Sequence, residues 1–147
     1  QITNLKNLKI GIPKEYFAKM LEILTPAGLA QLLITRYNDT VIAAEIVTFY
    51  DGVASYLYGA SSHEYRNTMA PYLMHWEAIK LAKEKKCSTY DLLAIAPEGV
   101  ENHKYRGITR FKEQFGGRKA HLLGSWDVVY KPFWYKMFKL VEKYRRK

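Results

Sequence analysis

The chain has 147 residues, a length that fits a single domain. Hydrophobic residues make up 48% and aromatic residues 14%, which excludes a disordered chain. The net charge of +9 is equally compatible with an anionic partner, such as a nucleic acid, a phosphorylated substrate or an anionic membrane surface, and with a merely basic surface. One cysteine excludes both an internal disulfide and a cysteine-based zinc site. No apolar run is long enough to span a membrane.

The first half of the chain predicts a helix followed by three antiparallel strands. Residues 1–12 read as an entry segment, and apolar residues at helical spacing predict a helix from Pro13 to Leu24. Strands are predicted over 29–37, 40–50 and 53–60. Asn38-Asp39 and Asp51-Gly52 separate them, and Asp-Gly between β-rich runs is a strong hairpin signal. The middle strand is apolar on both faces, so we expect helices on both sides of the sheet.

The second half alternates helices and strands. We expect a polar loop over 61–70, a helix over 71–86, a strand over 89–96 and a loop over 97–107. A short helix over 108–115, strands over 119–123 and 126–130, and an amphipathic basic helix over 133–146 complete the chain. An antiparallel meander that leads into strand–helix–strand units predicts a mixed α/β fold.

This order of elements is similar to the GNAT acyltransferase fold. GNAT acetyltransferases carry a glycine-rich loop whose backbone N–H groups bind the pyrophosphate of coenzyme A. The corresponding segment, residues 61–71, contains no glycine. Use of acetyl-CoA is therefore disfavoured, and no cofactor is expected.

Three sequence blocks resemble the FemABX family of peptidoglycan aminoacyl transferases. The first is Tyr-Leu-Tyr-Gly-Ala-Ser-Ser at 56–62, followed by Glu-Tyr-Arg at 64–66 and Ala-Pro at 70–71. The second is Trp-Glu-Ala-Ile at 76–79 with Ala82 and Tyr-Asp at 90–91. The third is Gly-Ile at 107–108, Phe-Lys at 111–112, Phe-Gly-Gly at 115–117, Gly124 and Trp-Asp at 126–127. The blocks follow the family's order and spacing over most of the chain.

The resemblance implies that residues 1–147 form one GNAT-like domain, the second domain of a longer two-domain protein whose first domain precedes it. It implies transfer of an aminoacyl group from aminoacyl-tRNA to an amine of a peptidoglycan precursor, which is a lipid-linked or nucleotide-linked muropeptide. The implied location is the cytoplasm, with the inner face of the membrane as a further surface. Both polyanionic substrates suit a basic protein.

The chain departs from the family pattern after Tyr90-Asp91. Family members often have an aromatic residue and a glycine there, whereas this chain has Leu92-Leu93-Ala94. Loss of the glycine removes a place where a ligand or a backbone approaches closely. Substrate contacts on that strand are therefore in doubt.

Lys112 is the first candidate for a catalytic residue. It lies beside Phe111 on the predicted short helix, and the resemblance places it at the Phe-Lys motif of the family. We expect an electrostatic role, either on the developing oxyanion or on the acceptor end of the tRNA. A surface lysine on an amphipathic helix would have the same spacing.

The candidates for substrate binding are tyrosines and arginines near the blocks. Arg66 suits bidentate phosphate binding and lies beside Tyr65 in the loop that replaces the pyrophosphate loop. Tyr56 and Tyr58 are predicted to share one strand face, where Tyr58 would line a cleft or pack in the core. Arg106 and Arg110 would extend a basic rim around Lys112. The four histidines show no metal-ligand spacing.

Two other functions remain open from the sequence. The fold and the basic surface are compatible with a non-catalytic binding module, and the altered Leu93-Ala94 pair favours that alternative. An acetyl-CoA-dependent N-acetyltransferase is the second alternative, against which the glycine-free segment argues. The sequence does not determine the transferred amino acid, the acceptor or the oligomeric state.

Overall fold

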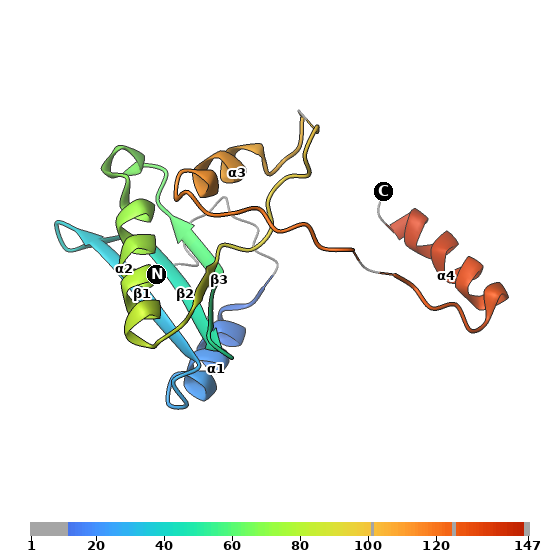
Figure 1. Ribbon diagram of the computed structural model, residues 1–147, viewed down its shortest axis with the longest axis horizontal. Coiled ribbons are helices and arrows are strands. Elements are labelled where there is room, and N and C mark those ends of the chain that lie inside the picture. Colours follow the sequence, from blue (N-terminus) through green and yellow to red (C-terminus); the bar gives the residue numbers. More distant parts are fainter. Residues whose placement is uncertain (1–11, 101, 125, 146–147) are drawn as a thin grey trace. The chain divides into compact units, whose positions relative to one another are not determined.

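The computed structural model describes residues 12–100, 102–124 and 126–145, which form two units (Figure 1). The first unit extends to Phe115 and the second begins at Gly116. The first unit contains α1 (Lys14–Leu24), β1 (Ala30–Tyr37), β2 (Thr40–Tyr50), β3 (Val53–Ser61), the short 3-10 helix η2 (Arg66–Thr68), α2 (Ala70–Glu84), β4 (Thr89–Asp91) and α3 (Arg106–Glu113). The second contains α4 (Pro132–Arg145). Apart from Ile12, the predicted entry segment lies outside the described residues.

The predicted meander is confirmed. Strands β1 and β2 pair antiparallel, and so do β2 and β3. Both connections are two-residue turns with positive φ throughout, at 45° and 63° for Asn38-Asp39 and at 48° and 71° for Asp51-Gly52. Two positive φ angles define the hairpin turn whose twist matches that of the strands, and Asn, Asp and Gly adopt it most readily. The turn residues therefore set the pairing of all three strands.

The predicted strand–helix–strand unit is also present, which confirms the mixed α/β fold. Strand β4 pairs parallel with β3, and α2 forms the crossover between them, so that the sheet order is β1-β2-β3-β4. Helix α2 lies across one face of the sheet (Figure 1), where Ala78 and Ala82 pack against Val47 and Phe49. These contacts bury the α2-facing side of the middle strand.

The prediction that Tyr56 and Tyr58 share one strand face is wrong. The register between β2 and β3 shifts, so that Tyr56 pairs with Val47 and Tyr58 pairs with Ile46, with Leu57 between them unpaired. Neighbouring residues of β2 point to opposite faces, and cross-strand partners share a face. Tyr56 therefore faces α2, whereas the Tyr58 ring lies 5.0 Å from the Phe17 ring of α1.

The fourth strand is shorter than predicted, ending at Asp91 instead of residue 96. The Asp91 side chain accepts a hydrogen bond of 2.7 Å from the Leu93 N–H group. Leu93 has a φ of 59°, in the left-handed region. A side chain that bonds to the backbone two residues on, followed by a left-handed residue, ends an extended strand. The chain turns at Leu93.

The two predicted strands over 119–123 and 126–130 are wrong, because none of these residues is in a strand where the structure describes them. A strand requires a neighbour that satisfies its N–H and C=O groups, and β4 pairs over three residues only. The predicted terminal helix is confirmed as α4, which begins at Pro132. Within this unit the Tyr135 hydroxyl donates a 2.5 Å hydrogen bond to Asp127 Oδ2.

Candidate functional site

Five polar side chains meet on the α2-facing side of the sheet, and each comes from a different element. They are Glu45 of β2, Tyr56 of β3, His75 of α2, Tyr90 of β4 and Lys112 of α3. Among the described residues of the first unit, the buried polar ones are Glu45, His75 and Lys112, with exposed fractions of 1%, 1% and 7%. Buried polar groups are costly unless they are paired. We call these five residues the polar cluster.

Glu45 is the least satisfied member of the polar cluster. His75 Nδ1 lies 3.3 Å from Glu45 Oε2, close enough for an ion pair. The orientation does not allow a hydrogen bond, and neither Glu45 oxygen has a hydrogen-bond partner among the described residues. Burial raises the pKa of Glu45 to about 7. Burial, assisted by the charge of Lys112, lowers the pKa of His75 to about 4. His75 is therefore neutral at physiological pH, and the contact is not a salt bridge.

The neutral His75 ring is held by Tyr90. Its Nδ1 atom lies 2.8 Å from the Tyr90 hydroxyl. Burial, together with the charges of Glu45 and Tyr56, raises the pKa of Tyr90, so the phenol keeps its proton. One hydrogen bond therefore joins two neutral groups: the Tyr90 hydroxyl is the donor when the histidine proton is on Nε2, and Nδ1–H is the donor when the proton is on Nδ1. Among the described residues, no group of three or more His, Cys, Asp or Glu side chains could hold a metal ion.

The Tyr56 ring lies between His75, Gly59 and Lys112. Its centroid is 4.5 Å from that of the His75 ring, and Lys112 Nζ lies 5.9 Å from it. A Cβ atom on Gly59 would stand 2.1 Å from the Tyr56 hydroxyl oxygen, so only a glycine leaves room for this ring. Burial, followed by the charge of Glu45, raises the pKa of Tyr56 to about 12.

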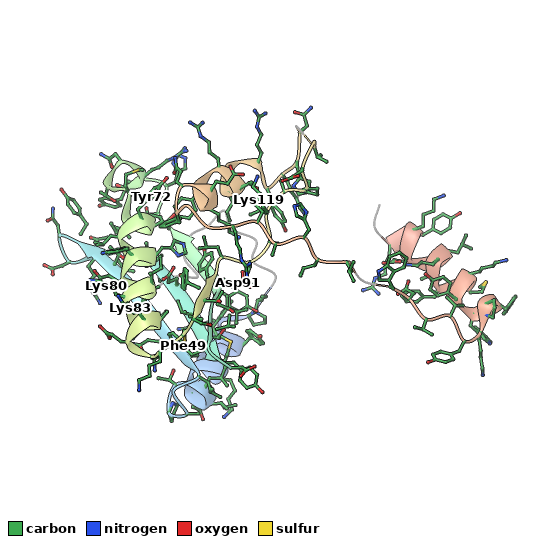
Figure 2. The ribbon with its side chains drawn as sticks, in the orientation of Figure 1. Phe49, Tyr72, Lys80, Lys83, Asp91 and Lys119 are labelled. Atoms are coloured by element: carbon green, nitrogen blue, oxygen red, sulfur yellow. The ribbon has the colours of Figure 1, made fainter. Side chains whose placement is uncertain are left out.

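Helix α3 places Lys112 in the cluster through contacts on two sides. Thr109 accepts a 2.8 Å hydrogen bond from the Ala96 N–H group, which ties α3 to the segment after β4. On the other side, the rings of Phe111 and Phe115 pack against Tyr72 at 4.9 and 5.6 Å; Tyr72 is labelled near α3 in Figure 2. These contacts fix α3 with Lys112 on its inner face.

The Lys112 ammonium is anchored to the backbone. Its Nζ atom donates a 2.7 Å hydrogen bond to the Ala94 carbonyl. Burial lowers the pKa of Lys112, and the Asp91 carboxylate opposes that shift. An ammonium has three N–H donors, and Ala94 is the one hydrogen-bond acceptor that the described residues supply. The other two N–H donors of Lys112 have no hydrogen-bond partner among the described residues.

The turn at Leu93 aims the Ala94 carbonyl at Lys112. A branched side chain in the left-handed region costs about 1–2 kcal/mol, and glycine avoids this cost at the expense of about 0.5–1 kcal/mol of backbone entropy. Leu93, which belongs to the segment that departs from the family pattern, is therefore strained. It lies next to Ala94, whose carbonyl anchors the Lys112 ammonium. The Lys112 side chain reaches the backbone of this segment without the glycine.

Leu93→Gly is accordingly expected to raise the free energy of unfolding by about 0.5–1 kcal/mol, because it relieves the strain and keeps the hydrogen bond to Asp91. Urea unfolding of both proteins measures the difference. Leu92→Gly, at a position without positive φ, is the matched control and should lower stability. A similar loss in both variants would show that Leu93 is unstrained.

The predicted Tyr65-Arg66 pair lies at the entry to α2. The Tyr65 ring is 6.0 Å from that of Tyr37 and packs against the buried cluster formed by Ile42, Ala43, Ala70 and Met74. Arg66 begins the 3-10 helix and is exposed. The contacts of Tyr65 and of the Arg66 backbone lie away from the polar cluster.

The remaining predicted residues surround Lys112 less closely than expected. Arg106 and Arg110 are four residues apart on α3 and both are exposed, whereas Lys112 is buried. They therefore lie on the outer face of the helix rather than beside the Lys112 ammonium. Tyr58 lies on the α1 side of the sheet, opposite the polar cluster. The structure thus joins Lys112 with Tyr56 and separates it from Tyr58.

Glu45, His75 and Tyr90 were not selected as site residues by the sequence analysis. One signal for Glu45 was present: it is the single charged residue of an apolar run, Val-Ile-Ala-Ala-Glu-Ile-Val, in a strand predicted to be covered on both faces. An ionisable residue in such a place requires a partner or a function. His75 and Tyr90 carry no comparable signal, because their meeting depends on how α2 packs.

Comparisons with known proteins agree with this architecture. A sequence model described as the FemAB family matches residues 23–143. A lipid II:glycine glycyltransferase of Staphylococcus haemolyticus is 28% identical over 101 residues, 69% of this chain and 24% of that protein. One of Staphylococcus epidermidis is 28% identical over 117 residues, 80% of this chain and 27% of that protein. The chain thus spans about a quarter of the length of these curated relatives.

Solved structures show the fold. The aminoglycoside N-acetyltransferase AAC(6')-Iy has a TM-score of 0.63 at 13% identity, covering 84% of this chain and 86% of that chain. A ribosomal-protein-alanine N-acetyltransferase of Brucella melitensis has a TM-score of 0.54 at 15% identity, covering 81% and 82%. Both are N-acetyltransferases by name, which supports the GNAT-like fold. Since the family model covers most of the chain, this GNAT-like protein belongs to the FemAB family.

Proposed function

We propose that this chain is the second GNAT-like domain of an enzyme that moves an aminoacyl group from aminoacyl-tRNA to an amine of a peptidoglycan precursor. Membership of the FemAB family supports the proposal, and so do relatives that act on lipid II and glycine by name. The observation that carries it is the buried Lys112, whose ammonium is anchored to the Ala94 carbonyl near the Tyr56 ring and His75.

The chemistry is attack of an amine on an ester. The carbonyl oxygen becomes negative as the amine adds, and the ribose oxygen of the tRNA leaves. A cation that is held in place and shielded from water stabilises that developing charge more strongly than one in solution. Lys112 supplies such a cation, and the hydrogen bond to Ala94 orients it before the substrate binds. No step of this reaction requires a cofactor.

The exposed arginines suit the polyanionic substrates. Arg66, Arg106 and Arg110 can each pair with a phosphate of tRNA or with the diphosphate of the precursor. We also propose that Tyr65 and Tyr58 contact the less polar parts of the substrates. Within the described residues, no helix is long and apolar enough to cross a membrane. We further propose that the protein acts at the inner face of the membrane, where it would reach a lipid-linked precursor.

A transfer assay tests the proposed function. The full-length protein is incubated with tRNA charged with labelled glycine and with lipid II, and label is followed into the lipid fraction. We expect transfer to lipid II and none in parallel reactions that contain labelled acetyl-CoA instead of charged tRNA. Transfer from acetyl-CoA alone would identify an acetyltransferase, and transfer from neither donor would favour a non-catalytic module.

Binding of uncharged tRNA should depend steeply on salt. If Arg66, Arg106 and Arg110 each neutralise one phosphate, affinity falls roughly 40-fold between 50 and 200 mM salt, because the released counterions oppose binding. Filter binding over that range measures the slope. Replacing the three arginines by Gln should flatten it by about three. An equal slope in that variant would place the phosphate contacts elsewhere.

A further inference from the structure

The polar cluster contains a carboxylate, that of Glu45, which the transfer chemistry described above does not use. It has no partner, and it is buried beside a glycine and a tyrosine ring. Glu45 has an exposed fraction of 1%, and both of its oxygens lack hydrogen bonds among the described residues. Fully buried carboxylates are normally paired or coordinated. Burial of the unpaired Glu45 side chain therefore lowers the stability of the fold, and an apolar residue at this position would not have that effect.

None of the cations and donors around Glu45 forms a hydrogen bond to its carboxylate among the described residues. Lys112 of α3 donates to the Ala94 carbonyl. His75 of α2 directs its Nδ1 atom to the Tyr90 hydroxyl of β4. Tyr56 of β3 has no recorded hydrogen bond to the carboxylate. These four residues come from α3, α2, β4 and β3, and none neutralises the carboxylate; β1 places the apolar Leu33 opposite Glu45. The arrangement of the cluster therefore leaves the carboxylate without a partner.

The space beside Glu45 can be vacated by a single side chain. Gly59 is the cross-strand partner of Glu45, so the two residues face the same side of the sheet. The space where Gly59 lacks a Cβ atom is filled by the far end of the Tyr56 side chain. We call this space the Gly59 slot. Rotation of the Tyr56 ring would open the slot toward the carboxylate without moving the backbone.

We propose that Glu45 and the Gly59 slot form the subsite for the attacking amine, which Tyr56 closes in the ligand-free protein. This inference rests on the proposed function and names the part of the site that takes the acceptor. The ligand class is a primary ammonium group, R–NH₃⁺, at the end of an unbranched chain. The positive charge of the ammonium pairs with the Glu45 carboxylate. The unbranched chain is narrow enough for the Gly59 slot, which the edge of the Tyr56 ring fills in the ligand-free protein.

The chemistry in the subsite is acyl transfer with two proton transfers through Glu45. The ammonium gives a proton to the Glu45 carboxylate, which leaves R–NH₂ and a neutral carboxyl group. The amine nitrogen then forms a bond to the ester carbon, and the bond to the ribose oxygen breaks as Glu45 gives its proton to that oxygen. The nitrogen, which is positively charged after the attack, gives its second proton to the carboxylate that has formed again, so the amide is neutral and one proton is released to water overall. A carboxyl with a pKa of about 7 suits both directions of proton transfer near neutral pH.

Binding of a small amine to the intact 147-residue chain tests the subsite without any transfer. The probe is n-butylamine at millimolar concentration, and n-butanol is the neutral control. The Glu45 carboxyl carbon, followed by NMR in the ¹³C-labelled protein, should shift with butylamine and stay unchanged with butanol. Its titration midpoint should also fall, because a bound cation favours the carboxylate.

Three variants separate the parts of the subsite. Tyr56→Ala removes the cover and should tighten butylamine binding by about tenfold, since less energy is needed to open the slot. Gly59→Ala displaces the Tyr56 ring but puts a methyl group in the slot itself, so it should abolish saturable binding while the charge of Glu45 is retained. Glu45→Gln should abolish binding without unfolding the chain, which is verified by its NMR spectrum.

The outcomes of binding and transfer are distinguishable. If butylamine leaves the Glu45 carbon unchanged in both the wild type and Tyr56→Ala, the inference is overturned, even if the full-length protein transfers glycine. If butylamine binds as described but no transfer occurs, the proposed function is wrong and the amine subsite stands. In an active protein, Glu45→Gln should lower kcat/KM for the acceptor at least about 100-fold. Unchanged turnover would also overturn the inference.

Discussion

Replacing Lys112 by Met is expected to lower aminoacyl transfer by about 100- to 1,000-fold while the protein stays folded. Loss of one preorganised donor to a developing oxyanion has an effect of this size. Met keeps the apolar stem that packs in the cluster and removes only the ammonium. Steady-state kinetics with charged tRNA and lipid II measure the change, and most of it should appear in kcat, because the interaction strengthens as the charge develops.

The controls separate catalysis from stability. Both variants leave the Ala94 carbonyl unbonded, but Lys112→Ala also leaves a cavity, so it should unfold at lower urea concentration than Lys112→Met while showing a similar loss of transfer. Lys83→Met, at an exposed position on α2 that Figure 2 labels, removes the same charge from the surface and should keep normal turnover. Turnover near the wild-type rate in Lys112→Met would show that the ammonium is not catalytic.

The features that were predicted from the sequence are those that local chemistry determines. Asn38-Asp39 and Asp51-Gly52 adopt a hairpin turn by their own backbone preferences, so the meander follows from four residues. The amphipathic spacing of α2 and α4 identifies them in the same way. The Phe-Lys motif led to Lys112, although its burial and its bond to Ala94 depend on how α3 docks.

The features that were missed depend on partners distant in sequence. A β-bulge at Leu57 places Tyr58 on the opposite face of the sheet from Tyr56, and the sequence of β3 does not predict the bulge. The segments over 119–123 and 126–130 have strand-like composition, but composition supplies no neighbouring strand. His75 reaches Glu45 and Tyr90 only because α2 crosses the sheet at that point. Tertiary packing, which periodicity does not encode, decided each case.

The stability of the folded protein should depend on pH through the buried residues Glu45 and His75. Replacing either residue should change that pH dependence, in opposite directions for the two variants. The pKa of Glu45 is raised from 4.5 to about 7, so this residue destabilises the fold as pH rises between those values. The pKa of His75 is lowered from 6.5 to about 4, so this residue destabilises the fold as pH falls between those values. Each effect amounts to about 3 kcal/mol, and the two oppose each other between pH 4.5 and 6.5.

Removing one partner exposes the effect of the other. Relative to the wild type, Glu45→Gln should gain about 3 kcal/mol of stability as pH rises from 4.5 to 7, because the cost of ionising Glu45 disappears. His75→Gln should gain a similar amount as pH falls from 6.5 to 4, because no buried imidazole then resists protonation. Urea unfolding at intervals between pH 4 and 8 measures both differences, and ionisations elsewhere cancel because all three proteins share them. Differences that stay constant with pH would mean that neither side chain is held neutral by burial. Opposite slopes would show that the fold tolerates a neutral carboxyl and a neutral imidazole in contact, which is the protonation state that an incoming ammonium would disturb.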